Sequence, residues 1–387
     1  MKKILFTFLF TLLGVAFLAT ENEVQAQVGN KYYYKKTTPR RGPHNHQWVW
    51  TPRRQYVSVG LNVNAMNYFG DIVPKPSFWS TDLRFTRPNI GIFVEKKFRP
   101  QFSARLGLNY GRLLSSDEET ADPANGHDMF RYIRNASFRN DVFELNTTFR
   151  WDLMSSELLN KEFYQRPKQF VPYVIGGLAV FYHAPKAKAP ETKIGGGDPD
   201  WGAGEWTDLQ SLGTEGQGRG SYTKYFANGD SVVRDLGKKY SKVQIAIPLG
   251  FGIRKKLSNR IDIAFEFSYR FLLTDYLDDV SRNYIDLGVF GDDELAKAFH
   301  DRSLEGDRSE KLAEMAGNGE LFRLLNSYTY TGVDGKVYNT FDGFGSDPYI
   351  DPSIRGNQKD NDVYMLTGFH LIYIIPPHGV RCPVRFK

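Results

Sequence analysis

The segment Ile261–Leu272, IDIAFEFSYRFL, alternates large apolar residues with polar or small ones. Its odd-numbered positions carry Ile, Ile, Phe, Phe, Tyr and Phe, and its even-numbered positions carry Asp, Ala, Glu, Ser and Arg as far as Arg270. Because successive side chains of a β-strand point to opposite faces, this pattern predicts a strand with one apolar face and one charged face.

Seven further segments show the same alternation, so the sequence predicts eight strands. The other seven begin near Val57, Ile90, Phe102, Phe143, Pro172, Val243 and Val363. Two of them are less regular. The segment from Pro172 to Tyr182 is apolar on both faces, which leaves its outward face unassigned, and Pro248 removes a hydrogen-bond donor from the Val243 segment.

The connections between these strands alternate in length. Residues 96–101 and 255–259 make tight links, whereas the links from strand one to two, three to four, five to six and seven to eight are long. A soluble β-sandwich would show the same alternation within strands. Short and long connections in turn around an even number of strands are typical of bacterial outer-membrane barrels, in which the short turns face the periplasm.

Composition favours the same class. Aromatic residues make up 15% of the 387 residues, yet the mean hydropathy is only −0.45, as expected when lipid-facing and interior residues alternate. The formal charge of +6 is too small to indicate a nucleic-acid partner. We therefore predict an all-β fold, an eight-stranded antiparallel transmembrane β-barrel with long extracellular loops and some short helices in the last loop.

Four parts of the chain are predicted. Residues 1–26 have the pattern of a cleaved signal peptide: Lys2 and Lys3, an apolar stretch, and Val24-Gln25-Ala26 before the cleavage point. Residues 27–54 form a basic, aromatic periplasmic arm, 55–375 the barrel and 376–387 a C-terminal tail. The signal peptide and the barrel together predict an outer-membrane location.

The arm contains no acidic residue. Aromatic side chains among positive charges favour docking on a partner protein, and the alternative is a disordered leader or one that lies on lipid headgroups. The docking candidates are Lys31, Tyr32, Tyr33, Tyr34, Lys35, Lys36, Arg40 and Arg41.

The faces predicted to point into the barrel carry equal numbers of opposite charges. An interior of eight strands is just wide enough for side chains to fill, so buried charges have to pair. The predicted salt-bridge network consists of Glu95, Arg105, Glu144, Arg150, Arg254, Asp262, Glu266 and Arg270.

The last long loop, 272–361, is unusually large, and we predict an ordered cap or docking surface there. Helix starts are expected at Asp292–Glu294 and at Ser309. The glycine-rich loop 183–241 lacks the lysine of a phosphate-binding loop.

No enzymatic activity and no cofactor are predicted. The seven histidines are scattered, and His370 is the one on a confidently assigned inward face, where a structural role is expected. A hydrolase would require His183 or His127 to approach Asp278 or Ser281. The lone Cys382 fits no metal-binding pattern.

Several strings resemble one family. Residues 274–281, TDYLDDVS, resemble the signature of PorG, the outer-membrane barrel of the type IX secretion system of Bacteroidota, and residues 67–71, 134–141, 212–218 and 355–357 agree with it. The motif residues are Tyr68, Gly70, Asp71, Arg134, Phe138, Arg139, Gly213, Glu215, Gly216, Gly218, Thr274, Asp275, Tyr276, Asp278, Asp279, Arg355 and Gly356. The arm and the tail lie outside the resemblance.

The resemblance implies a noncatalytic barrel in the outer-membrane lipid that associates with a PorK-like lipoprotein and PorN-like periplasmic ring proteins. The motifs fall on the long-loop side of the predicted barrel. Two interpretations follow. Either the motifs build the outer rim or cap of the barrel, or the long loops face the periplasm and the predicted assignment of the two sides is inverted. The alternative function is a surface ligand-binding or adhesive barrel that uses its long loops.

The aspartates of residues 274–281 have two interpretations. Asp275, Asp278 and Asp279 could ligate calcium, because clustered carboxylates supply hard oxygen donors. The favoured interpretation is that Asp275 and Asp279 pair with Arg134 or Arg139 on a neighbouring loop, with Tyr276 at the membrane interface.

Overall fold

The computed structural model describes residues 55–72, 83–99, 101–121, 126–153, 170–194, 196–225, 229–305, 327–341 and 355–375. The predicted signal peptide, the arm with its docking candidates, the tail and the helix at 309–316 lie outside the described residues.

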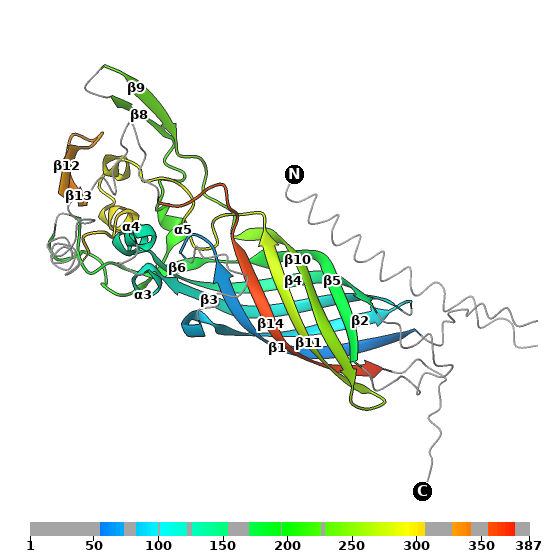
Figure 1. Cartoon of the computed structure of the whole chain (residues 1–387). Coiled ribbons are helices and arrows are strands. Elements are labelled where there is room, and N and C mark those ends of the chain that lie inside the picture. The colour runs from blue at the N-terminus through cyan, green and yellow to red at the C-terminus, as the bar shows by residue number, and fades with distance from the viewer. Residues whose placement is uncertain are drawn as a thin grey trace, which may run out of the picture. The chain divides into compact units, whose positions relative to one another are not determined.

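Eight strands close into the predicted antiparallel barrel (Figure 1). They are β1 (Tyr56–Phe69), β2 (Arg87–Lys97), β3 (Phe102–Ser116), β4 (Ser137–Asp152), β5 (Phe170–Tyr182), β10 (Val243–Lys256), β11 (Ile261–Leu272) and β14 (Val363–Ile375). Their order is β3-β2-β1-β14-β11-β10-β5-β4, and pairing of β3 with β4 closes the ring. The fold class predicted from the alternation is confirmed.

The long connections carry smaller elements. These are η2 (Leu83–Phe85), α3 (Asp117–Thr120), α4 (Gly126–Arg134), β6 (Pro185–Lys188), β7 (Trp206–Asp208), α5 (Leu209–Leu212), β8 (Ser221–Tyr225), β9 (Ser231–Asp235), η4 (Leu287–Phe290), α6 (Glu294–His300), β12 (Ser327–Thr331) and β13 (Val337–Phe341). Helix α6 begins where the acidic run predicts it, and the Asp293 carboxylate accepts a hydrogen bond from the Ala296 amide at its first turn. No helix among the described residues is long and apolar enough to cross a membrane.

The apolar face of each strand points outward. Leu61, Ile92, Phe149 and Phe369 are all more than half exposed, whereas the polar residues between them are buried. Strand β5, which the sequence left unassigned, follows its neighbours, because Tyr182 lies opposite the outward Phe143 of β4. Its even-numbered side chains therefore face out.

Two residues of the middle strands disturb the ladder. The pairing of β10 with β5 omits Ile247 and Pro248, as expected where a donor is missing. In the same region Gly177 lies so close to β4 that an added Cβ would sit 2.1 Å from the Thr147 carbonyl oxygen. The backbones approach each other there without a side chain between them.

The eight charged residues predicted to face inward are all buried. Glu95 is paired with three arginines: Arg150 at 2.7 Å, Arg254 at 3.1 Å and Arg105 at 3.2 Å. The other pairs are Arg105–Glu266, Arg254–Asp262 and Arg270–Glu144. Lys97 and Asp152, which the sequence analysis did not include, extend the network at 2.9 Å.

The barrel interior is filled. The interior cavity lined by Asn62, Arg105, Glu266 and His370 holds about 10 Å³, which is room for a single water molecule. His370 is 3% exposed, packs beside Phe93 and lies 3.8 Å from Glu266. These side chains leave no open pore through the described part of the barrel.

Candidate functional site

All four long connections leave the same end of the barrel, and their helices and hairpins gather there (Figure 1). We call the described residues of these connections the cap: 70–72, 83–86, 117–136, 183–242, 273–305, 327–341 and 355–362, without the gaps given above. The five motif segments, far apart in the sequence, meet in or at the edge of the cap.

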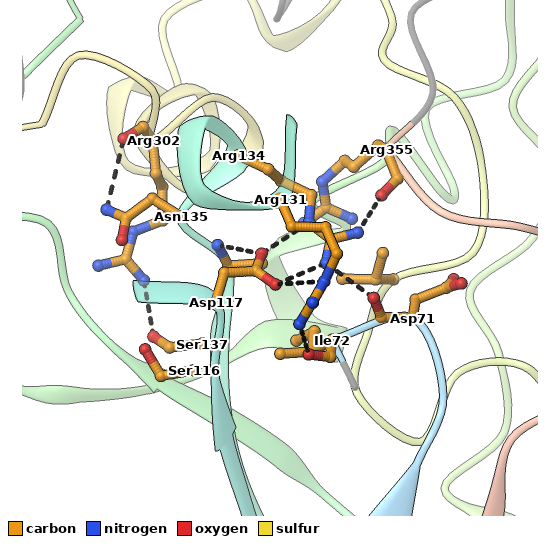
Figure 2. A network of polar contacts seen from close by, with 12 residues as sticks. Asp71, Ile72, Ser116, Asp117, Arg131, Arg134, Asn135, Ser137, Arg302 and Arg355 are labelled. Atoms are coloured by element: carbon orange, nitrogen blue, oxygen red, sulfur yellow. Dashed lines mark hydrogen bonds and ion pairs between the residues drawn. The ribbon is translucent and has the colours of Figure 1, made fainter. Parts of the chain in front are cut away.

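Arg134, the last residue of α4, joins three segments (Figure 2). Its guanidinium forms two hydrogen bonds with the Asp117 carboxylate, at 2.7 and 2.8 Å. It also donates to the carbonyl oxygens of Arg355, at 2.5 Å, and Asp71, at 2.9 Å. Because a guanidinium presents its donors in a rigid fork, Arg134 holds these segments in one arrangement.

Glu215 forms a second junction. Its carboxylate is fully buried and pairs with the Arg355 guanidinium at 2.6 Å. It also accepts hydrogen bonds from the backbone amides of Ser281, at 2.9 Å, and Arg282, at 3.1 Å. Gly356 allows this approach, since an added Cβ would lie 2.6 Å from the Ser281 nitrogen.

Tyr68 lies between two carboxylates at the edge of the barrel. Its hydroxyl is 2.5 Å from Asp278 Oδ2 and 3.0 Å from Asp362 Oδ1. A tyrosine hydroxyl has one proton to donate, so the second contact needs a proton on one of the two carboxyl groups. A proton on Asp278 or Asp362 would satisfy both contacts at once.

Burial explains why protons stay in the cap. Desolvation raises the pKa of Asp71 to about 6, of Asp279 to about 7 and of Asp275 to about 9. The pKa values of Asp278 and Asp362 are also raised, first by burial and then by the repulsion of neighbouring carboxylates. Arg134 and Arg355 oppose these shifts only in part.

The raised pKa values of the cap aspartates predict that the cap is less stable at alkaline pH. An unfolded aspartate ionises near its usual value of 3.8, so above pH 4 the unfolded cap loses protons that the folded cap keeps. The free energy of opening the cap is therefore highest near pH 4 and falls as the pH rises to 9. We expect hydrogen exchange at residues 274–281, corrected for its intrinsic pH dependence, to show decreasing protection from pH 5 to 9. Asp362→Asn should flatten that dependence, and a protection that rises with pH would contradict the sign.

The predicted pairing of the aspartates is wrong. Arg134 pairs with Asp117, and the Arg139 guanidinium lies 4.2 Å from the Trp206 ring. Asp279 accepts hydrogen bonds instead from the hydroxyls of Thr214 and Tyr240. The cause is that loop segments distant in the sequence supply closer donors than the strand-flanking arginines do.

Tyr276, predicted to lie at the membrane interface, contacts another residue of the cap. It is half-buried and stacks on Tyr240 with ring centroids 4.7 Å apart. The calcium interpretation has no geometric counterpart, since no group of three acidic, histidine or cysteine side chains in the described ranges is placed to hold a metal ion.

The remaining motif residues shape the cap. Gly213, Gly216 and Gly218 have φ of 65°, 79° and 84°, a backbone conformation that favours glycine. A Cβ on Gly70 would lie 2.0 Å from the Tyr68 hydroxyl, and Phe138 packs edge-on against the Tyr68 ring at 4.8 Å. The Thr274 hydroxyl accepts a hydrogen bond from the Tyr276 amide.

Sequence reasoning missed three groups that complete the site. Asp117, Tyr240 and Asp362 lie in ordinary polar loop sequence, where neither periodicity nor spacing distinguishes them. The only signal was that Asp117 and Asp362 directly adjoin a strand end and that Tyr240 precedes one by three residues.

The cap histidines have structural surroundings. His183 is fully buried, lies 3.4 Å from the Asn140 amide and stacks on Tyr240. Desolvation lowers its pKa to about 4, so it is neutral at physiological pH. The side chain of His127 lies outside the described part of the structure.

A closed barrel with an apolar outer face and paired charges inside defines a transmembrane β-barrel. Residues 48–194 match a family described as a domain of unknown function, DUF6089, which covers less than half of the chain. No curated protein matches the sequence.

Three solved structures are similar over much of their length. Neisserial surface protein A (NspA) has a TM-score of 0.28 and 8% identity, over 83% of this chain and 96% of that one. OprG from Pseudomonas aeruginosa has a TM-score of 0.28 and 7% sequence identity, over 82% of this chain and 95% of that one. Ail of Yersinia pestis was crystallised with the heparin analogue sucrose octasulfate. It has a TM-score of 0.23 and 8% sequence identity, over 56% of this chain and 85% of that one. Likeness at this level carries no ligand or activity over to this chain.

Proposed function

We propose that the protein is a non-enzymatic outer-membrane component of the type IX secretion system. It is exported through a cleaved signal peptide and anchors or organises the periplasmic ring of PorK-like and PorN-like proteins at the membrane. One observation supports this proposal: the five separate segments that resemble PorG converge on one buried polar network, through Arg134, Glu215 and Tyr68. The resemblance thus falls on residues that contact one another directly and are not merely gathered at one end of the barrel.

The burial of the motif residues bears on where partners bind. Arg134, Glu215 and Asp278 are 7% exposed or less, and their polar atoms are used within the cap. Such residues build a rigid cap and offer little to a partner. We therefore place the contacts with the ring on the short-turn side, on the arm or the turns, and take the motifs as the part that shapes the cap.

The test is purification of the protein, tagged in the exposed β12–β13 turn of the cap at Gly335, from its native membrane in mild detergent. We expect PorK-like and PorN-like proteins to accompany it, and deletion of residues 27–54 to remove them while the barrel stays folded. Recovery of the barrel alone, from membranes that contain those proteins, would contradict the secretion role.

A second function is favoured by one feature of the cap. Tyr225 and Val233 of the β8–β9 hairpin are 79% and 68% exposed, as in a surface that binds an external ligand. Replacing both with Ser separates the two functions. A secretion component should keep exporting its cargo, whereas an adhesive barrel should lose binding with its own insertion unchanged.

A further inference from the structure

The acidic residues that the structure describes at the short-turn end of the barrel point inward. Glu95, Asp152 and Asp262 are at most 4% exposed, and each is paired with a basic side chain of the interior. Their negative charge is therefore used inside the barrel. None of it reaches the outer surface of the described strands at this end.

The outward positions of the same end carry only positive charge in the described residues. Lys96 and Lys255 continue the outward rows of β2 and β10, and Arg99 and Arg260 are exposed in the two tight turns. We call these four residues the basic rim. Lys96, Arg99 and Lys255 have no acidic partner among the residues that the structure describes.

Aromatic side chains lie beside the basic rim. Phe102 stacks on Trp151 with centroids 6.2 Å apart, and the Lys255 ammonium lies 4.7 Å from the centre of the Phe170 ring. Arg260 donates to the Tyr373 hydroxyl at 3.4 Å. Rings of this kind concentrate at the level of lipid headgroups, directly beyond the apolar belt.

The opposite end of the barrel has a different arrangement. There the outward Arg112 pairs with Asp141 at 2.6 Å, and Lys242 pairs with Asp208 at 2.5 Å. At these two positions a carboxylate neutralises the outward cation, whereas Lys96, Arg99 and Lys255 have no such partner among the described residues. A surface with unpaired cations at headgroup height is complementary to phosphate.

We propose that the basic rim binds the phosphate groups of phospholipids in the leaflet at the short-turn end, and that it prefers anionic phospholipids. The inference rests on the membrane placement of the barrel and is independent of the secretion role. Arg260, whose guanidinium contacts Tyr373, orders the rim against the aromatic side chains. The lipid headgroup supplies the anions that Lys96, Arg99 and Lys255 lack among the described residues.

The test uses the full mature chain in nanodiscs of mixed phosphatidylcholine and phosphatidylglycerol, with the lipids retained on the protein counted by native mass spectrometry. We expect phosphatidylglycerol to be enriched at low salt. The enrichment should fall by up to about fivefold for each rim charge removed, so that Lys96→Gln/Arg99→Gln/Lys255→Gln retains little of it. It should also weaken at 0.5 M salt, where charges are screened over a few ångströms.

A matched control removes three exposed lysines of the cap, Lys188→Gln/Lys238→Gln/Lys359→Gln, with the same change in net charge. It should keep the enrichment. No preference in the wild type, or an equal loss in both triple variants, would overturn the proposal. So would a rim variant that loses a protein partner while its lipid preference is unchanged. If the triple variant does not fold, the single variant Lys255→Gln provides the same comparison.

Discussion

Arg270→Glu should abolish the heat-resistant folded form of the barrel. Arg270 is 4% exposed, and its guanidinium contacts the Glu144 carboxylate at 3.1 Å. Glu144 also accepts hydrogen bonds from Asn109, Asn146 and Tyr364, so it cannot turn away. The substitution removes the partner of a buried charge, which alone costs about 3–5 kcal/mol, and then places a second carboxylate beside it. Mobility of heated and unheated samples on a gel measures the loss.

The matched control is Arg112→Glu, which reverses an arginine on the outer face of β3. Its pair with Asp141 is partly exposed, with side-chain exposures of 43% and 28%, so the expected loss is below about 1 kcal/mol. Equal folding of both variants would refute the claim that the interior charges hold the barrel together. Failure of both would indicate instead that any reversal near a strand prevents insertion.

The barrel could be predicted from sequence because its information is local. A period of two specifies which face of a strand meets lipid, and the pattern at Ile261–Leu272 was sufficient for that. Loop lengths then placed all long connections at one end. Strand β5 resisted assignment because apolar residues fill both of its faces, with Tyr173 and Phe181 buried inside and Phe170 and Leu178 outside. Only the pairing of such a strand with its neighbours shows which of its faces points outward.

The interior pairs were predictable in kind and less so in detail. Equal numbers of buried opposite charges require pairing, but which arginine reaches Glu95 depends on how the strands are staggered around the ring. Three arginines do so, from β3, β4 and β10. Lys97 and Asp152 were missed because the pattern near the strand ends mixes inward and turn positions.

The cap could not be derived from its sequence. Its contacts join residues that are distant along the chain, such as Arg134 with Arg355 and Tyr68 with Asp362, and no periodicity relates them. Several motif residues, among them Arg134, Glu215 and Tyr68, take part in the buried contacts of the cap, yet the partners assigned to Asp275 and Asp279 were wrong. Three-dimensional packing decides what each of these side chains contacts.

Arg355→Met should open the cap and leave the barrel intact. The substitution leaves Glu215 fully buried, with the backbone amides of Ser281 and Arg282 and the side-chain amide of Gln217 as its remaining hydrogen-bond donors. Loss of one partner of a buried ion pair costs about 3–5 kcal/mol, which corresponds to an increase in local opening of about a hundredfold to a few thousandfold. We expect hydrogen exchange to accelerate by that factor at residues 274–282, while strands β3 and β4 keep their protection.

The double variant Glu215→Gln/Arg355→Met tests whether charge, and not the volume of the arginine, is responsible. With the carboxylate neutralised, the buried charge that paired with Arg355 in the ion pair is gone, so most of the protection at residues 274–282 should return. If the double variant exchanges as fast as Arg355→Met, the arginine stabilises the cap through its hydrogen bond to the Asp279 carbonyl and its packing. Export of cargo in the two variants then shows whether secretion needs the cap. If it does, export should fail in Arg355→Met and recover in the double variant. If the cap only closes the barrel, export should be unchanged in both.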